Sequence, residues 1–252
     1  MDMVTAPRFL TQDITGCKSN TRTGPGQRIQ GDDLQATASF LSSQVMTIET
    51  IYRDERIVAV DKPSGLLSVP GIGPEKADCL VSRLQEAHPG ARIVHRLDRD
   101  TSGLMVLGLD AEAHRHLSIQ FQDRKVYKRY EAMVAGRVGP DEGTIDLPIA
   151  KDRDRTPRQK IDFETGRPAQ TRFRVLERLE DHSRLELEPL TGRSHQLRLH
   201  LLELGHPILG DDLYAPTEAL RAAERLLLHA TDLHLHHPAT ERLLALSSPA
   251  PF

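Results

Sequence analysis

Residues 95–104 read His-Arg-Leu-Asp-Arg-Asp-Thr-Ser-Gly-Leu, a dense run of charged side chains that leads directly into Met105-Val106-Leu107. The apolar residues predict a buried strand, and the Ser-Gly pair before them predicts a turn. Charged groups beside a core strand are costly to desolvate unless each has a partner, which favours a chemical role. A solvated turn with a surface ion pair explains these ten residues equally well. Asp98, between Arg96 and Arg99, is the candidate catalytic carboxylate.

Length, charge and cysteine content limit the class of protein. A chain of 252 residues can bury a core without disulfides or metals, and Cys17 and Cys79 have no metal-ligand spacing, which predicts a reducing, cytoplasmic compartment. We find no signal-peptide pattern and no window of about eighteen apolar residues. The net charge is −3, from 33 basic and 36 acidic side chains, so a nucleic-acid partner requires a local basic patch.

The pattern of apolar residues predicts one folded domain over residues 46–252, after a flexible polar extension over residues 1–45. Predicted strands are 47–52, 57–60, 105–107, 130–134, 171–176 and 184–187, and predicted helices are 78–86, 111–121, 196–204 and 218–228, the last capped by Thr217. Because strands outnumber helices and do not alternate with them, the sequence predicts an α+β fold on a mainly antiparallel sheet.

Three basic segments are candidates for binding an anion. Residues 191–200 place Arg193, Ser194 and Gln196 near the start of a predicted helix, where phosphate and carboxylate groups bind readily, although an ordinary basic helix face fits equally well. Residues 124–130 interleave four basic residues with two tyrosines, a combination that suits RNA, although charge runs usually stay solvated. Residues 151–160 predict an exposed basic hairpin or loop.

Other signatures in the chain exclude several chemistries. The run Leu233-His234-Leu235-His236-His237 alternates like a strand and lacks a third ligand, so we predict a strand and turn and no metal site. The sequence contains no Gly-rich phosphate loop, no dinucleotide fingerprint and no Gly-x-Ser-x-Gly elbow. A glycoside hydrolase would need a second carboxylate about 5–10 Å from Asp98, and no acidic pair stands out.

Five ordered segments resemble the RluA family of pseudouridine synthases, over roughly residues 46–252. They are residues 95–103, 61–66, 128–136, 191–198 with 205–211, and 226–230 before His237-Pro238. The resemblance implies the catalytic fold of that family, a central mainly antiparallel mixed sheet flanked by helices and loops. It also implies isomerisation of uridine to pseudouridine in RNA, without a cofactor.

The resemblance implies roles for individual residues. Asp98 is the essential carboxylate, acting as a nucleophile at the sugar or as a base at C2′, and Arg198 pairs with Asp98 and keeps it ionised. Tyr130 stacks on the target base, Arg96 fills the space that the uridine leaves, and Leu197 packs under the base. Substrate-binding roles are expected for His95, Thr101, Arg193, His195 and Gln196. On charge alone, we expect RNA backbone contacts from Arg124, Lys125, Lys128, Arg153, Arg155 and Arg158.

Residues 66–71, 146–149 and 164–171 resemble the family members that modify two kinds of RNA. This resemblance implies uridine 746 of 23S ribosomal RNA and uridine 32 in the anticodon stem-loop of transfer RNA as targets. The chain is expected to lack the S4 RNA-binding domain of many relatives and to act as a monomer. The alternatives are a synthase of this family that acts at another ribosomal site, and a non-catalytic RNA-binding protein of this fold.

Overall fold

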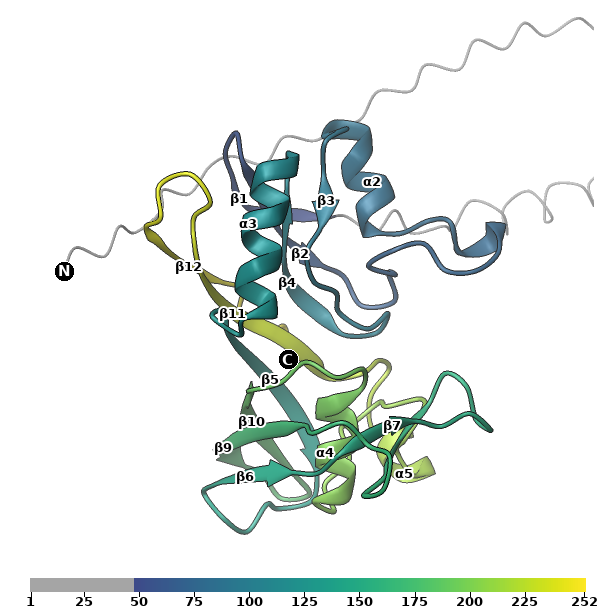
Figure 1. Cartoon of the computed structure of the whole chain (residues 1–252). Helices are drawn as coiled ribbons and strands as arrows, with labels where there is room; N and C mark the ends of the chain where they lie inside the picture. Colours follow the sequence, from purple (N-terminus) through teal and green to yellow (C-terminus); the bar gives the residue numbers. More distant parts are fainter. Residues whose placement is uncertain (1–47) are drawn as a thin grey trace, which may run out of the picture. The chain divides into compact units, whose positions relative to one another are not determined.

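The computed structural model describes residues 48–252, which belong to one compact unit, Met46–Phe252 (Figure 1). The predicted extension over residues 1–45 lies outside the described residues. The strands are β1 (Glu49–Arg53), β2 (Ile57–Lys62), β3 (Arg92–Ile93), β4 (Ser102–Gly108), β5 (Tyr127–Ala135), β6 (Glu142–Asp146), β7 (Ile149–Lys151), β8 (Gln159–Ile161), β9 (Gln170–Arg178), β10 (His182–Pro189), β11 (Leu228–His236) and β12 (Leu243–Ser247). The helices are η1 (Pro74–Lys76), α2 (Leu80–Ala87), α3 (Ala111–Gln122), α4 (Gln196–Glu203) and α5 (Thr217–Arg221).

A ten-stranded mixed sheet organises the described residues, in the order β1-β2-β4-β11-β5-β10-β9-β6, with β12 on β11 and β3 on β4. Its strand pairs are antiparallel except β4–β11, which is parallel and joins only two residue pairs. A separate hairpin, β7–β8, carries the predicted exposed basic loop. The predicted α+β class with a mainly antiparallel mixed sheet is therefore confirmed.

Strands β2 and β4 are buried on both faces, which explains why their sequences are continuous apolar runs rather than alternating ones. Ile57, Ala59 and the even-numbered apolar residues of β4 pack with α3, as Figure 1 also shows. Val58, Val60 and the odd-numbered apolar residues of β4 pack with α2. A further cluster joins β5, β9 and β10 to Leu197 and Leu201 of α4. The sheet therefore supports distinct cores on the two sides of the β4–β11 junction.

The β4–β11 junction fixes the position of the charged segment that precedes β4. Gly103 lies opposite Ala230 with φ +114, and a Cβ there would overlap the backbone of Ala230, so the position requires glycine. Tyr130 of β5 pairs with Ala230 from the other side and packs against the cores on both sides of the junction. The segment that ends at Thr101 is therefore held where the two parts of the sheet meet.

The predicted helix over residues 218–228 is wrong. Helix α5 ends at Arg221, and the chain enters β11 at Leu228. Leu226 and Leu228 are buried in the core beside β5 and β10, so tertiary packing overrides the helix predicted for this segment. Pro216 takes the N-cap position, and Thr217 is the first helical residue rather than its cap. Strands β3, β6 and β12 are additions that the sequence pattern did not predict.

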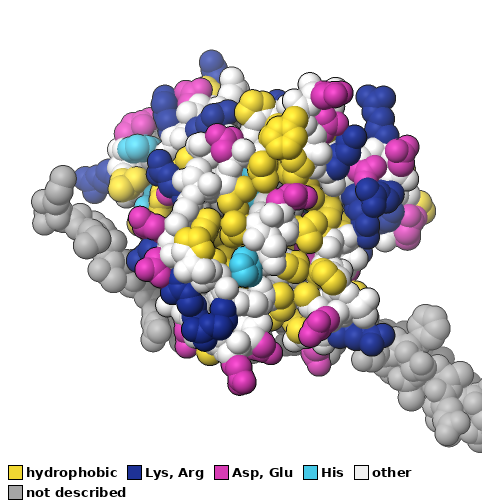
Figure 2. All heavy atoms as spheres, turned by 90° about the horizontal axis from the view of Figure 1, so that it is seen from below, with side chains coloured by type: hydrophobic (Ala, Val, Ile, Leu, Met, Phe, Trp, Pro, Cys, Tyr) yellow, Lys and Arg dark blue, Asp and Glu magenta, His cyan; other side chains and the backbone are white. Residues whose placement is uncertain are grey.

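Charges are mixed on the face seen from below Figure 1. There, acidic and basic side chains surround a central area of hydrophobic side chains (Figure 2). Within residues 48–252, no helix is long and apolar enough to span a membrane.

Candidate active site

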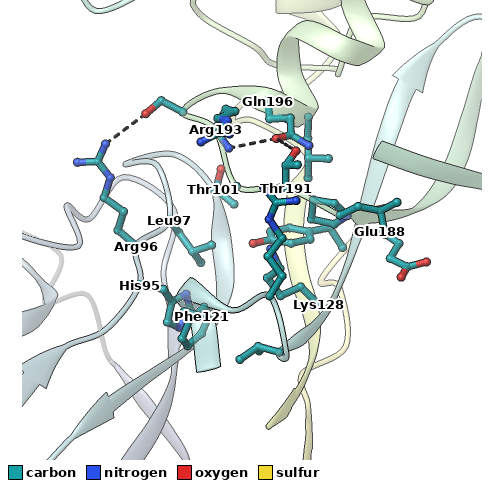
Figure 3. Close-up of a pocket in the computed structure, with 18 of the residues that line it drawn as sticks. His95, Arg96, Leu97, Thr101, Phe121, Lys128, Glu188, Thr191, Arg193 and Gln196 are labelled. Atoms are coloured by element: carbon teal, nitrogen blue, oxygen red, sulfur yellow. Dashed lines mark hydrogen bonds between the residues drawn. The ribbon is translucent and has the colours of Figure 1, made fainter. Parts of the chain in front are cut away.

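A cleft of about 800 Å³ opens at the β4–β11 junction. Three segments line it: the loop before β4, the connection from α3 to β5, and the turn that leads into α4 (Figure 3). It brings together most of the predicted site residues: His95, Arg96, Leu97, Asp98, Thr101, Arg124, Lys125, Lys128, Tyr130, Arg193, His195, Gln196, Leu197 and Arg198. Arg153, Arg155 and Arg158 lie on the β7–β8 hairpin and do not line the cleft.

The backbone around Asp98 is held by the segment that follows β2. Ser68 Oγ donates to the carbonyl of Leu97 at 2.7 Å and accepts from the Leu97 N–H at 3.1 Å. On the other side of Asp98, the Gly65 N–H donates to the carbonyl of Arg99 at 2.9 Å. Because both neighbours of Asp98 are fixed, its carboxylate is positioned before any substrate binds.

Lys62 is a functional residue that the sequence analysis missed. Its side chain is fully buried, and Nζ donates to the carbonyls of Pro63, Leu66 and Arg99 at 2.8–2.9 Å. Burial lowers the pKa of Lys62 to about 8, although the negative charges of nearby carboxylates oppose this change. The ammonium group therefore stays mainly charged at pH 7 and uses its three donors to secure the loop. A lysine that ends an otherwise apolar strand was the available signal.

The expected ion pair between Arg198 and Asp98 is not what the structure shows. Arg198 is buried and donates through Nε to Asp211 at 2.8 Å, through Nη2 to the same carboxylate, and through Nη2 to Asp212 at 3.0 Å. Burial alone would lower the pKa of Arg198, but its hydrogen bonds with Asp211 and the charges of Asp211, Asp98 and Asp212 raise it. Asp98 therefore interacts with the charge of Arg198 without forming an ion pair with it, because the guanidinium group is already hydrogen-bonded to Asp211.

His195 faces Asp98 across the cleft, with its Nε2 4.0 Å from Asp98 Oδ1. Its Nδ1 lies 2.6 Å from the hydroxyl of Tyr214, a residue that the sequence analysis did not single out. Burial lowers the pKa of His195, so the imidazole is neutral at pH 7. The residue that faces Asp98 is therefore a neutral hydrogen-bonding group.

Gln196 lines the cleft and holds the turn that leads into α4. Its Oε1 accepts from Thr191 Oγ1 at 2.7 Å and from the Arg193 N–H at 3.0 Å, and its Nε2 donates to Gln170 O and Thr171 Oγ1. These four bonds use the full capacity of an amide. Gln196 therefore fixes the turn before α4 (Figure 3), and its substrate-binding role stays a prediction.

Tyr130 and Leu197 form apolar surfaces beside Asp98. Burial and the negative charge of Asp98 raise the pKa of Tyr130, so its phenol is neutral at physiological pH. Leu197 is buried at the start of α4 and packs in the same core as part of Tyr130. Arg96 reaches across the cleft and donates to Ser194 Oγ at 3.2 Å (Figure 3). The cleft therefore places the positioned carboxylate of Asp98 beside apolar side chains and an arginine held by one side-chain hydrogen bond.

The cleft is strongly basic. Seven of its lining residues are lysine or arginine, and two, Asp98 and Glu188, carry carboxylates. Arg124, Lys128 and Arg167 have no ion-pair partner within residues 48–252. Arg167 was not predicted; its only sequence signal was its place in a segment matched to the family. With a net charge of −3, the chain needs a local basic patch to bind a nucleic acid, and the cleft provides one.

His95 belongs to the wall rather than to the chemistry. Its Nε2 accepts the Val106 N–H at 3.1 Å, and its ring stacks on Phe121 with centroids 4.4 Å apart. Burial, with a smaller contribution from the charge of Lys128, lowers the pKa of His95 to about 3. The imidazole is therefore an uncharged acceptor that anchors the loop to β4.

The lowered pKa of the partly buried His95 predicts acid-sensitive stability. His95 binds a proton near pH 6.5 in the unfolded chain but only near pH 3 in the folded protein. Its contribution to the free energy of unfolding is therefore fully present above pH 6.5 and decreases as the pH is lowered toward 3. We expect a loss of about 2 kcal/mol in the free energy of unfolding between pH 7 and pH 5 from this residue. Urea unfolding measured between pH 7 and pH 5 should show a shallower pH dependence of the free energy of unfolding for H95Q than for the unsubstituted protein. Equal slopes for H95Q and the unsubstituted protein would contradict the assignment.

The sequence profile of the RNA pseudouridylate synthase family matches residues 56–203. The chain is 49% identical over 203 residues to "Dual-specificity RNA pseudouridine synthase RluA" of Escherichia coli (strain K12), covering 80% of this chain and 93% of that protein. It is 51% identical over 189 residues to the protein of the same name from Yersinia pestis, covering 75% of this chain and 92% of that protein.

Solved structures agree with these sequence relatives. Human RNA Pseudouridylate Synthase Domain Containing 1 superposes with a TM-score of 0.70 at 29% identity, covering 82% of this chain and 84% of that one. Human RNA Pseudouridylate Synthase Domain Containing 4 superposes with a TM-score of 0.65 at 28% identity, covering 81% and 88%. The chain therefore belongs to the RNA pseudouridylate synthase family and is an isomerase that acts on RNA.

Proposed function

We propose that this protein is a dual-specificity pseudouridine synthase that modifies uridine 746 of 23S ribosomal RNA and uridine 32 of transfer RNA, with Asp98 as the catalytic carboxylate. The relatives from two bacteria carry the words dual-specificity in their names, which supports the choice of targets. One observation carries the assignment of Asp98. It is a half-buried carboxylate, fixed by its neighbours, in a cleft otherwise rich in basic groups.

The reaction defines what the cleft must do. The bond between N1 of uracil and C1′ of ribose breaks, the base turns, C5 bonds to C1′, C5 loses a proton, and N1 gains one. No oxidant or added group is needed. Asp98 acts either by attacking C1′ or by removing the C2′ proton, and in both cases it must be ionised. Tyr130 and Leu197 provide surfaces that hold the detached base while it turns.

The uridine has to leave its stack to reach Asp98, at a cost of a few kcal/mol that is smallest in loops. Arg96 spans the cleft through a single hydrogen bond to Ser194 on an exposed face, so little holds it there. Releasing that bond frees the guanidinium to occupy the space that the uridine vacates. Targets in loops therefore suit this cleft better than paired uridines.

We expect Arg124 to bind the RNA backbone. Arg124 has φ 58, a left-handed conformation that glycine adopts without strain, and its exposed side chain lines the cleft without an ion-pair partner. R124G should therefore leave stability unchanged or slightly raised while lowering RNA affinity and reducing the salt slope by about 1. Filter binding of an anticodon stem-loop across a salt series measures both effects.

The matched control for Arg124 is Arg115, an exposed arginine on α3 that does not line the cleft. R115A removes the same charge and should leave affinity and salt slope close to those of the unsubstituted protein. Equal losses in R124G and R115A would mean that net charge, and not the cleft, binds RNA. The same binding assay tests the predicted RNA backbone contacts of Arg153, Arg155 and Arg158, whose hairpin lies outside the cleft.

Mapping pseudouridine in ribosomal and transfer RNA tests the proposed targets. Cells with and without this protein should differ at both uridines, and expression of the intact protein should restore the modification. Loss at a different ribosomal position would make it a synthase of other specificity. Modification that is unchanged in the deletion strain would contradict both targets. We further propose that the enzyme acts in the cytoplasm as a monomer, supported by its cysteine content and by a cleft built within one chain.

A further inference from the structure

We infer that Tyr214 and His195 are positioning residues for Asp98: the Tyr214 hydroxyl fixes His195 in the tautomer that directs its Nε2–H at the Asp98 carboxylate. The inference rests on the proposed catalytic role of Asp98. It gives His195 a role other than the substrate binding that the resemblance implied, and it adds Tyr214, which the resemblance did not single out. It also replaces Arg198 as the group that faces Asp98 directly.

The hydrogen bonds of Tyr214 determine the tautomer. Its hydroxyl oxygen accepts the Gln159 N–H at 2.8 Å and lies 2.6 Å from His195 Nδ1. Burial raises the pKa of Tyr214, so the phenol keeps its proton, and among the described residues His195 Nδ1 is the acceptor within reach. Because Nδ1 accepts, the neutral ring carries its proton on Nε2. That nitrogen is the one that lies 4.0 Å from Asp98 Oδ1.

Both residues are held rigidly. The guanidinium of Arg198 lies over the Tyr214 ring at 5.2 Å, that of Arg158 lies 6.0 Å from it, and the Tyr214 N–H donates to Asp211 at 3.0 Å. His195 has φ 57 at the N-cap of α4, a left-handed conformation that is uncommon for residues other than glycine. Strained positions persist where the surrounding structure over-determines them, and they cluster at functional sites. The backbone alone would favour Gly or Asn there.

The 4.0 Å separation is longer than a hydrogen bond, and catalytic contacts often tighten only when substrate is bound. A neutral His195 that donates to one oxygen of Asp98 leaves the other oxygen free for the sugar. A protonated His195 would pair with the carboxylate and make it less reactive. The groups that face His195 are Asp98, Asp211 and Asp212, which raise its pKa, and Arg198, which lowers it. Burial outweighs the acids and keeps the ring neutral.

The test is Y214F, measured as a single-turnover rate of pseudouridine formation with saturating enzyme from pH 5 to pH 8. Loss of the hydroxyl removes a donor to Nδ1, so His195 takes up a proton more readily and the acid limb of the rate profile should move up by about half a pH unit or more. The rate at pH 7 should fall about tenfold while the Kd for RNA stays within about twofold. H195N, which tolerates the left-handed backbone and cannot titrate, should move the acid limb to lower pH.

The control is Y52F, which removes another tyrosine hydroxyl with a hydrogen bond, to Asp54 at 2.8 Å, outside the cleft. Y52F should match the unsubstituted protein in rate and pH profile whatever its effect on stability. A Y214F profile with an unshifted acid limb would overturn the inference, and so would an unshifted profile in H195N. The proposed function fails separately, through retained activity in D98N.

Discussion

Replacing Asp98 with asparagine should lower the single-turnover rate of pseudouridine formation by at least about three orders of magnitude without unfolding the protein or abolishing RNA binding. The amide has nearly the shape of the carboxylate but can neither attack C1′ nor remove the C2′ proton. The loop that carries it is fixed through the backbones of Leu97 and Arg99, so its conformation does not depend on the Asp98 side chain.

The rate is measured by release of tritium from RNA labelled at C5 of uridine, because C5 loses its hydrogen in the reaction. RNA affinity is expected to stay the same or rise, since D98N removes one of two carboxylates from a basic cleft. D100N is the matched control: Asp100 pairs with Arg99 at 2.9 Å, does not line the cleft, and should change the rate only severalfold. Activity in D98N above one per cent of the unsubstituted enzyme would remove Asp98 from the central role.

The sequence predicted the strands and helices whose buried positions follow from the local spacing of apolar residues. The apolar runs of β2 and β4 are buried on both faces, so a continuous run is all that the strand requires. Helix α3 has an apolar stripe that faces β2 and β4, with Asp110 as its N-cap. The prediction failed after α5 because local sequence does not record that Leu226 and Leu228 are buried against β5 and β10 in the core.

The site was predictable in its membership but not in its pairing. The loop before β4, the α3–β5 connection and the turn before α4 were each singled out, and the cleft unites them. The path of the chain after α4 determines which carboxylate pairs with Arg198. Asp211 is held in that position because it also accepts hydrogen bonds from the N–H groups of Leu213 and Tyr214. Lys62 was missed because its partners are backbone carbonyls, which local sequence does not reveal, and one of them belongs to the distant Arg99. Tyr214 was missed because its partners, the Gln159 N–H and the His195 ring, are far away in sequence.

Replacing Arg198 with methionine should cost about 3–5 kcal/mol in the free energy of unfolding, because it leaves the Asp211 carboxylate buried without its counter-charge. The Arg198 side chain is 2% exposed and that of Asp211 is not exposed at all, so water cannot replace the missing donors. Urea unfolding at pH 7 measures the loss. The double variant R198M/D211N should recover part of it, since the uncompensated charge is gone.

The pair of Arg174 and Glu186 provides the contrast: the Arg174 side chain is 57% exposed, so R174M should cost far less stability than R198M. The relative losses of stability and of activity in R198M distinguish two roles for Arg198. If this arginine served mainly to pair with Asp98, R198M would lose activity while remaining stable, and restoring stability through D211N would leave the rate low. If it holds Asp211 and supports Tyr214, as its hydrogen bonds indicate, stability falls first. A fully stable, inactive R198M would favour the direct pairing and contradict the structural one.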